Sequence, residues 1–540
     1  MQSSVSWASA LLLSTALIVS GCSKQGSATA GPSGVWRIAV PINPTQLNPI
    51  LAQNTIEGFI DSLMFSKLVT IDDKGNDVPD LAQVVPTQAN GGISKDGLTI
   101  TYHLRTNAKW HDGTPVTSKD VKFTWQAIMS TANNVLSKHG YDQIASIDTP
   151  DDHTVVMHMK HVFPPAVDTI FGESDTPYGI LPAHLLAKYP NLNQIPFDAA
   201  PVGSGPFKFG RWERNDRIVL EANPDYYRGA PKLKQVVVRI VTDSNTTESL
   251  LRTHEVDLAL ETTAFLYNDF ANAPHYVRQV VDAPSWVALF YNLKRPPLDD
   301  LAVRRAIGLA IDKTSIIDKT TYGTGTPLAA DQTRFSWAYD PSLKPIPYDV
   351  TQAKALLRQD GWIPGPDGIR RKNGQRLSLQ LAFGLGSPST RNMVVLVQQM
   401  LKGVGIDLQV KGYDYQLLYG SQETGGIYNS GKFDIGVYPW VSGADPDDSS
   451  MWLCSMAPPA GNNIPKYCSS EMDAAQKMAL STFDRTRRKA AYAKVQELLL
   501  RDQPGVFLFA NRLRYVHTDD LQNFTPNGVS EGWNAYQWNR

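Results

Sequence analysis

The chain has few cysteines and almost no net charge. Three cysteines in 540 residues are too few for a disulfide scaffold and lack the spacing of a zinc site. The 51 Lys and Arg residues face 52 Asp and Glu residues, leaving a net charge of −1. The basic excess that nucleic-acid binders use against phosphates is therefore missing, and we expect no nucleic-acid partner.

Long hydrophobic runs are also missing from most of the chain. After the N-terminal segment, no apolar run reaches the roughly 18 residues of a membrane-spanning helix, so we expect a soluble body. Hydrophobic residues make up 42% of the chain and charged residues 19%, a composition typical of folded proteins. At roughly 150 residues per domain, this length predicts three or four domains.

The N-terminal segment predicts export. Ala8–Ile18 is apolar but too short to span a bilayer comfortably, as in a signal peptide. The four residues that end at Cys22, VSGC, resemble a bacterial lipobox, in which cleavage before the cysteine is followed by lipidation of its thiol. We therefore expect a signal peptide over 1–22, a flexible Ser/Gly/Ala/Thr-rich tether over 23–34, and a periplasmic or cell-envelope lipoprotein anchored to the membrane.

The alternative is an ordinary secretory signal in which Cys22 is incidental, and the absence of Lys and Arg before Trp7 weakens the signal. Export also affects the other two cysteines. Cys454 and Cys468 form an even pair in an oxidising compartment, where a disulfide between them is expected. Two buried free thiols are the alternative.

Strand and helix patterns alternate along the body. Gly97–Arg105 alternates polar and apolar residues and predicts a half-buried strand, and Val236–Val241 predicts a buried one. Thr117 to Asp120 form a capping-box pattern before a helix over Val121–Met129. Further helices are predicted over Ser244–Arg252, Val303–Lys319, Thr351–Gln359, Asn392–Leu401 and Arg485–Arg501, and further strands over Leu377–Phe383, Ile406–Lys411, Phe433–Trp440 and Val506–Ala510. This mixture predicts an α/β protein with covered sheets.

No motif in the sequence requires catalysis or a cofactor. Gly426–Lys432 matches the first seven positions of a phosphate-binding loop, but Phe433 has no hydroxyl for Mg²⁺, so a Gly-rich loop is favoured. His153, His158 and His161 lie close in sequence, but in a strand-like, exposed-looking segment, and metal binding is not favoured.

An acidic run at Asp445, Asp447 and Asp448 is the remaining candidate for chemistry. It could form a metal or catalytic acid cluster, as in an exported hydrolase, but a helix cap in a solvated loop is favoured. We expect no enzyme activity, no metal and no cofactor.

Four ordered segments together resemble one family. They are Asp96–Trp125 (DGLTITYHLRTNAKWHDGTPVTSKDVKFTW), Pro201–Leu260 (beginning PVGSGPFKF and containing NPDYYRGAPKL), Asn292–Lys313 (NLKRPPLDDLAVRRAIGLAIDK) and Tyr348–Trp362 (YDVTQAKALLRQDGW). In these motifs the chain resembles the bacterial extracellular solute-binding proteins of the peptide/nickel group, family 5, which serve ABC importers. The resemblance runs from about Trp36 to the C-terminus.

The resemblance implies a periplasmic-binding-protein-like, type II Venus-flytrap fold. By analogy, lobe I comprises 35–80, 201–285 and 510–540, an inserted domain comprises 81–200, and lobe II comprises 286–509. It also implies a monomer that captures peptides or similar polar solutes between the lobes and delivers them to a permease with its ATPases. Other members of the family bind nickel complexes, haem, opines or oligosaccharides, and these ligands remain alternatives.

The resemblance also suggests where ligand is bound. In peptide-binding relatives an Asp shortly after a Trp holds the ligand ammonium, because an enclosed ammonium needs a charge partner. The corresponding positions after Trp440 here are Ser442 and Gly443, so this contact is expected to be absent. Asp445 could replace it if the loop shifts, or the ligand could lack a free amine.

Four other residues complete the candidate site. Trp440 and Tyr438 stand at the predicted end of a strand, where aromatic rings would contact ligand, and interior packing is the alternative. Asn292 lies in the predicted crossing strand between the lobes and could bind ligand main chain or form a hinge hydrogen bond. Asn43 lies in an early segment that borders the cleft in relatives.

Overall fold

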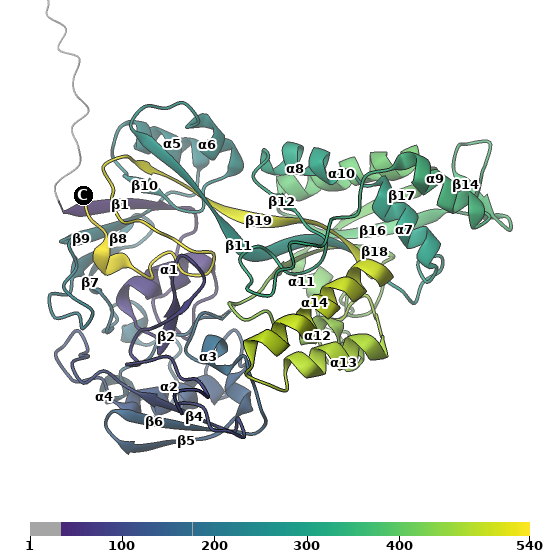
Figure 1. Cartoon of the computed structure of the whole chain (residues 1–540). Helices are drawn as coiled ribbons and strands as arrows, with labels where there is room; N and C mark the ends of the chain where they lie inside the picture. The colour runs from purple at the N-terminus through teal and green to yellow at the C-terminus, as the bar shows by residue number, and fades with distance from the viewer. Residues whose placement is uncertain (1–33, 175) are drawn as a thin grey trace, which may run out of the picture.

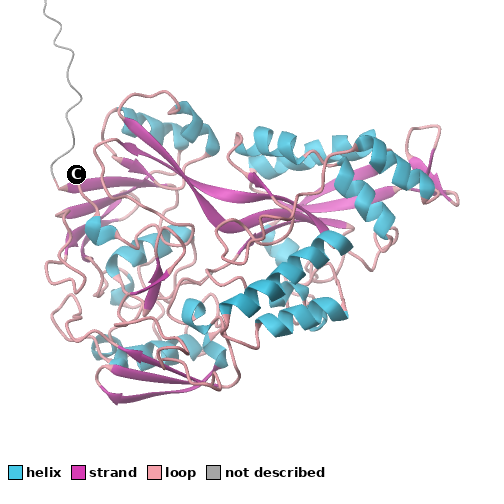
Figure 2. Ribbon diagram, viewed as in Figure 1, coloured by secondary structure: helices cyan, strands magenta, loops and turns pink. Residues whose placement is uncertain are grey.

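Two bodies joined by a pair of long strands make up the structure (Figures 1 and 2). The computed structural model describes residues 34–174 and 176–540. The predicted signal peptide with Cys22, and residues 23–33 of the predicted tether, lie outside the described residues. Within those residues, no helix combines the length and apolarity required to cross a membrane.

The joining strands are β11 (Tyr276–Tyr291) and β19 (Gly505–Thr518), which pair antiparallel from one body into the other. Their register runs from Tyr276 opposite Thr518 to Phe290 opposite Gly505. They occupy the middle of one sheet, in the order β17-β16-β18-β11-β19-β10-β1-β9-β8-β7. The short strand β12 (Thr326–Pro327) pairs with β19 on the edge that does not face β11. We call the body around β1 the first lobe and the body around β16 the second lobe.

In the first lobe, β1 (Val35–Val40) lies parallel between β10 (Leu258–Ala259) and β9 (Gln235–Ile240). The sheet continues antiparallel through β8 (Arg217–Ala222) and β7 (Phe207–Glu213). Helices α5 (Ser244–Arg252) and α6 (Ala264–Asp269) lie on one side of this sheet and α1 (Thr55–Met64) on the other (Figure 1).

A smaller sheet, in the order β4-β6-β5, lies below the first lobe in Figure 1. Its strands are β4 (Thr99–His103), β5 (Ile144–Asp151) and β6 (Thr154–Met159), and α2 (Ser118–Met129) packs against it. The predicted capping box is present, since the backbone N–H of Thr117 donates to the Asp120 carboxylate at 2.7 Å. The core of this region is continuous with that of the first lobe and includes the buried Trp110. Its remaining elements are β2 (Val69–Ile71), β3 (Asp77–Pro79), η1 (Tyr141–Gln143), α3 (Ala166–Thr169), α4 (Ala183–Leu186) and η2 (Pro196–Asp198).

The second lobe contains the predicted strand–helix–strand unit, formed by β16 (Ser378–Gly384), α10 (Pro388–Gly403) and β17 (Asp407–Tyr413). The two strands are parallel, and β18 (Ile435–Val441) pairs between β16 and β11. One face of the sheet packs on α7 (Leu301–Ala310), α8 (Lys313–Thr321), α9 (Val350–Gln359) and α10. The other face packs on α11 (Tyr415–Tyr419), α12 (Ser449–Trp452), α13 (Ser470–Ala479) and α14 (Arg485–Asp502). The short elements of this lobe are β13 (Ile363–Pro364), β14 (Arg370–Lys372), β15 (Gln375–Arg376) and η3 (Cys454–Met456). The short helix η4 (Ala535–Gln537) belongs to the first lobe, whose core includes Ala535.

One predicted helix is wrong in its extent. The expected helix over Val303–Lys319 is divided into α7 and α8, with Ile311 and Asp312 between them. The Asp312 carboxylate accepts a hydrogen bond from the Ser315 backbone N–H at 3.0 Å and starts the second helix. An aspartate side chain that satisfies the free N–H groups of a helix start favours a new N-terminus over a continued helix.

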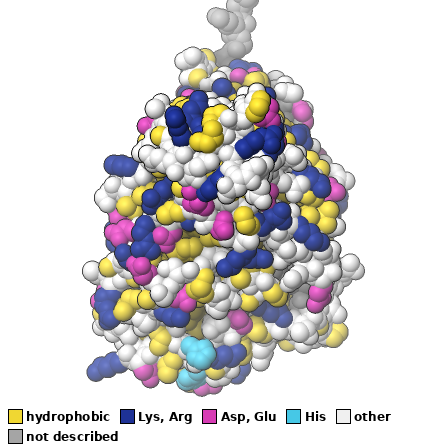
Figure 3. Space-filling model, turned by 90° about the vertical axis from the view of Figure 1, so that its right-hand side faces the viewer, with side chains coloured by type: hydrophobic (Ala, Val, Ile, Leu, Met, Phe, Trp, Pro, Cys, Tyr) yellow, Lys and Arg dark blue, Asp and Glu magenta, His cyan; other side chains and the backbone are white. Residues whose placement is uncertain are grey.

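One face of the second lobe carries charges of both signs. On the face seen when the right-hand end of Figure 1 is turned toward the viewer, basic and acidic side chains are interspersed (Figure 3). A surface of mixed sign does not present the extended basic face that phosphate backbones require.

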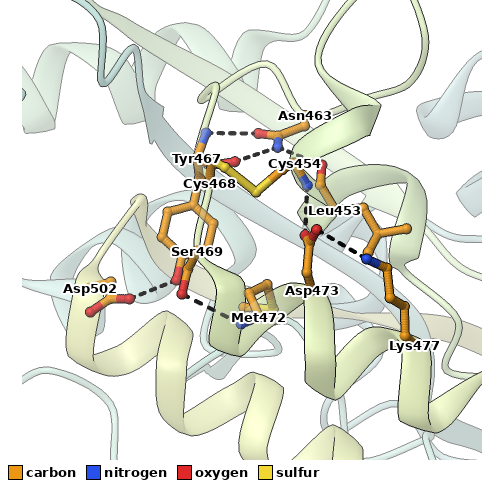
Figure 4. The surroundings of a disulfide bond; sticks show 10 residues. All are labelled: Leu453, Cys454, Asn463, Tyr467, Cys468, Ser469, Met472, Asp473, Lys477 and Asp502. Atoms are coloured by element: carbon orange, nitrogen blue, oxygen red, sulfur yellow. Dashed lines mark hydrogen bonds and ion pairs between the residues drawn. A yellow bond between two sulfur atoms is a disulfide. The ribbon is translucent and has the colours of Figure 1, made fainter.

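Cys454 and Cys468 are bonded to each other, with an S–S distance of 2.11 Å (Figure 4). The bond ties the loop after α12 to the start of α13. The Asp473 carboxylate in α13 reinforces the connection by accepting the Cys454 backbone N–H at 2.9 Å. The disulfide therefore lies only a few residues after the loop that carries the acidic run of residues 445–448.

We expect the double substitution Cys454→Ala and Cys468→Ala to lower the free energy of unfolding. The bond closes a loop with a sequence separation of 14 residues, and a loop of this size predicts a loss of about 3 kcal/mol. Denaturant unfolding of the oxidised protein and the variant measures this difference. Equal stability of the two proteins would contradict it.

Candidate ligand-binding site

One edge of β18 is open over its last residues. On that side β16 pairs only with Ile435 and Gly436, and no other strand of the described residues takes its place. The next carbonyl, that of Val437, accepts a hydrogen bond from the Tyr428 hydroxyl at 2.7 Å. The edge beyond Val437 is thus free of strand partners, which makes it a template for an added strand.

The direction of the main-chain groups on this edge follows from strand alternation. The Ser442 N–H donates to the Pro284 carbonyl in β11 at 2.7 Å, so even-numbered residues face β11. Pro439 and Val441 therefore direct their main-chain groups to the open edge. Pro439 has no N–H to leave unpaired, as is common on edge strands, while Val441 offers both a donor and an acceptor.

Two aromatic side chains of β18 extend from the core toward a cavity. Tyr438 is buried and stacks on Phe290, with ring centroids 5.2 Å apart, and on Trp440 at 6.1 Å. Trp440 is half-buried, and its indole Nε1 is shielded from solvent without a hydrogen-bond partner among the described residues. An unpaired buried N–H is costly, so this donor is available to a bound molecule.

A cavity of about 220 Å³ lies beside Trp440. The segment from Trp440 to Asp445 lines one wall, together with Asp447, Ser450 and Asn462. The opposite wall comes from the region of the small sheet and consists of Ser137, His139, Thr169 and Ser174. Most of these side chains are polar and neutral, which suits a solute that is rich in hydrogen-bonding groups.

The structure assigns Asp445 to a buried ion pair. Its two oxygens accept hydrogen bonds from Arg488 at 2.7 Å each, and both residues are buried. The same guanidinium also donates to the Ala479 carbonyl at 3.0 Å. A ligand ammonium could pair with Asp445 only by separating it from Arg488. That exchange is unfavourable, because it would leave the Arg488 guanidinium buried without its charge partner.

The expected solvated loop at Asp445–Asp448 is wrong, because Asp445 and Asp448 are buried. The Trp452 indole N–H donates to Asp331 at 2.8 Å and to Asp448 at 3.1 Å, which brings two carboxyl groups together. Burial raises the pKa of both carboxyl groups, and the charge of Asp331 raises that of Asp448 further. This pair therefore retains a proton that an exposed pair would lose.

The other residues predicted for the site lie in different places. Ser442 lines the cavity beside Trp440. Asn292 is buried, and its amide donates to the carbonyls of Gly431 and Phe433 at 3.1 and 3.2 Å. Asn43 is exposed and donates to Asn215 at 2.7 Å. Neither asparagine lines this cavity.

The wall formed by Ser137, His139, Thr169 and Ser174 was not predicted from the sequence. The polar composition of the loop before His139 was the one sequence signal for this wall. The wall it faces, Trp440–Asp445, lies some 300 residues later in the chain, so no local pattern connects the two. Among His153, His158 and His161, His158 pairs with Asp148 at 3.0 Å. The described residues contain no group of three or more His, Cys, Asp or Glu side chains placed to hold a metal.

The fold and this cavity define a two-lobed binding protein. Residues 78–462 match the family described as "Bacterial extracellular solute-binding proteins, family 5 Middle", and the chain belongs to this family. The motif-based prediction of the family is therefore confirmed.

Similar proteins share the fold along nearly the whole chain. The oligopeptide-binding protein AppA of Bacillus subtilis (strain 168) is 26% identical over 504 residues, covering 92% of this chain and 89% of AppA. The structure of AppA in complex with a nonapeptide has a TM-score of 0.73 and 25% identity, covering 94% and 98% of the two chains. NikZ from Campylobacter jejuni in complex with Ni(L-His) has a TM-score of 0.76 and 26% identity, covering 94% and 100%. These similarities confirm the predicted two-lobed α/β fold.

We expect Asp331→Asn to change how stability depends on pH. A carboxyl group whose pKa is raised by folding stabilises the protein at low pH, and this contribution is lost as pH rises above the ordinary value of about 4. The free energy of unfolding of the variant should therefore rise relative to wild type as the pH is raised above about 4.

Urea unfolding at several pH values measures this difference. Asp299→Asn, which removes an exposed carboxylate, is the matched control. Its free energy of unfolding should change with pH in the same way as that of wild type. A parallel profile for Asp331→Asn as well would show that the two buried carboxyl groups do not share a proton.

Proposed function

We propose that this protein is the substrate-binding component of an ABC importer, which captures peptides or similar polar solutes between its lobes and delivers them to a permease. The observation that carries the proposal is the open edge of β18 at Pro439 and Val441, beside the unpaired Trp440 N–H and a polar cavity. A peptide in extended form would pair with this edge as an added strand. Its side chains would then occupy the cavity without requiring one particular sequence.

Further elements of the proposal come from the sequence and the family. The family description as extracellular supports export, and the VSGC segment supports a lipid anchor at Cys22. We infer a monomer without catalytic activity, with lobe I over 35–80, 201–285 and 510–540, the inserted domain over 81–200, and lobe II over 286–509. Closure of the lobes over ligand would create the form that the permease and its ATPases recognise.

Asp447 is the carboxylate best placed to meet a ligand ammonium. It lines the cavity beside Trp440, and no Lys or Arg of the described residues forms an ion pair with it. One of its oxygens accepts the Ser449 backbone N–H at 3.0 Å. Burial, and then the nearby charge of Asp445, raise the pKa of Asp447. A ligand cation would relieve this unfavourable charge, whereas Asp445 already has Arg488.

We expect short peptides to raise the melting temperature of the mature protein and to be recovered intact. At 100 times the dissociation constant, a ligand adds about 2.7 kcal/mol to the stability of the folded state. Thermal unfolding with peptides of two to nine residues measures the shift, and chromatography of the ligand after incubation measures turnover. Nickel–histidine, an oligosaccharide and haem serve as comparison ligands.

The peptide proposal fails if none of the peptides shifts the transition while one comparison ligand does. A loss of intact peptide over time would instead support the hydrolase alternative. Trp440→Phe keeps the ring but removes the N–H, and we expect it to weaken peptide binding by several-fold because the donor is lost.

We expect Asp447→Asn to lower the binding affinity for free-amine peptides by about tenfold or more. A tenfold loss corresponds to one ion pair of about 1.4 kcal/mol. The same peptides with an acetylated amine should bind both proteins alike. Isothermal titration calorimetry of the four combinations measures the coupling between the carboxylate and the amine. Asp299→Asn is the control for loss of one negative charge.

An equal loss of affinity for the free-amine and the acetylated peptide in Asp447→Asn would contradict the pairing of Asp447 with the amine. It would leave the strand-addition site itself in place, because that site depends on main-chain groups.

A further inference from the structure

A second cavity lies on the opposite face of the crossing strands. It has a volume of about 310 Å³ and is lined by Val287 and Phe509 of these strands. Both residues belong to the core under α7–α10, whereas Tyr438 belongs to the core on the α11–α14 side. The cavity thus stands behind the strands that carry the candidate peptide site, in the space between α6 of the first lobe and α8 and α10 of the second.

Arg514 of β19 lines this cavity without an acidic partner. Its guanidinium donates to the Thr262 carbonyl at 3.1 Å, to the Thr324 hydroxyl at 3.0 Å and to the Arg512 carbonyl at 3.3 Å. These acceptors are all neutral, and no carboxylate of the described residues lies within ion-pair distance. A half-buried cation without a counter-ion is costly, and burial accordingly lowers the pKa of Arg514.

The rest of the cavity wall offers hydrogen-bond donors and no negative charge. No Asp or Glu is among the lining residues. Ser389 and Thr390 line it from the second lobe, Thr263 from the first, and Asn511 from β19. The hydroxyls of Ser389 and Thr390 and the Asn511 amide make no hydrogen bond within the described residues, so they remain available to a ligand. A guanidinium with several neutral donors is the donor set that proteins use for oxyanions.

We propose that this cavity binds a small oxyanion, such as a phosphate, sulfate or carboxylate group. Arg514 would supply the charge, and Ser389, Thr390 and Asn511 would supply hydrogen bonds from the other side. The bound anion would connect the first lobe, which holds Arg514 through Thr262, to the second lobe, which holds Ser389 and Thr390.

Anion binding would be linked to peptide binding, a consequence that rests on the proposed function. If the lobes close over peptide on one face of the crossing strands, they separate on the other face, where the anion lies. An anion that holds the two walls of this second cavity together therefore favours the open form of the lobes and lowers the affinity for peptide. Such coupling is reciprocal, so peptide lowers the affinity for the anion by the same factor.

The first experiment measures anion binding without peptide. The full mature chain is titrated with inorganic phosphate, and separately with sulfate, by calorimetry at constant ionic strength maintained with chloride. We expect saturable binding to wild type, a loss of about tenfold or more in Arg514→Met, and a several-fold loss in Thr390→Val, in line with the removal of one charge and one hydroxyl. Arg334→Met, which removes an exposed arginine, should bind like wild type.

Thr390→Val keeps the test decisive if Arg514→Met does not fold, because the Thr390 hydroxyl has no partner within the described residues to lose. Absence of saturable binding to wild type would overturn the proposal. Equal affinities of wild type, Arg514→Met and Thr390→Val would also overturn it, because the anion would then bind elsewhere.

The second experiment separates this proposal from the proposed function. Peptide affinity is measured with and without saturating phosphate, and we expect phosphate to weaken it about fivefold or more in wild type but not in Arg514→Met. Unchanged peptide affinity would overturn the linkage. If no peptide binds at all, the proposed function fails, while the phosphate titration still decides whether the anion site exists.

Discussion

Main-chain pairing between β11 and β19 is the constraint on which the rest of the structure depends. The two strands run antiparallel through both lobes, so the sheets of the two lobes are one hydrogen-bonded sheet. Their register shifts between Asp282 and Trp286 and again between Val287 and Ala288. Irregularities of this kind allow strands to bend and twist, and here they fall where the chain passes from one lobe to the other.

The crossing strands also place the two cavities. Successive side chains of a strand point to opposite faces, so Trp286 faces the aromatic core behind Tyr438 while Val287 faces the helices α7–α10. The cavity beside Trp440 and the cavity beside Arg514 therefore share one support and lie on its two sides. A movement of the lobes about these strands would change both cavities in opposite directions, which is the physical basis of the proposed linkage.

Buried charges decide which groups of the site remain available. Arg488 neutralises Asp445, and burial beside Trp452 raises the pKa of Asp331 and Asp448, which favours their neutral forms. The acidic run is consequently a structural anchor for its loop, with Asp447 as the member that faces the cavity without an ion-pair partner among the described residues. An overall charge of −1 reflects this internal matching as well as the mixed surface.

Local sequence determined much of the secondary structure, because caps and periodicity act over a few residues. The Thr117–Asp120 capping box, the helix over Ser244–Arg252 and the strand–helix–strand unit around α10 all follow from such signals. Ordered motifs of the sequence also identified the family. Asp312 shows the limit of such local signals, because its side chain caps a second helix inside a segment whose pattern predicts one helix.

Only the tertiary structure decided which side chains form the site. The partner of Asp445 lies in α14, the wall opposite Trp440 lies in residues 137–174, and the residues around Arg514 come from both lobes. No local pattern encodes such contacts, because they depend on how distant segments pack. By itself, then, the sequence determined many of the elements, the cysteine pair and the family. The open edge of β18, the engaged Asp445 and the unpaired charge of Arg514 follow from packing across hundreds of residues, where burial sets the cost of every unmatched polar group.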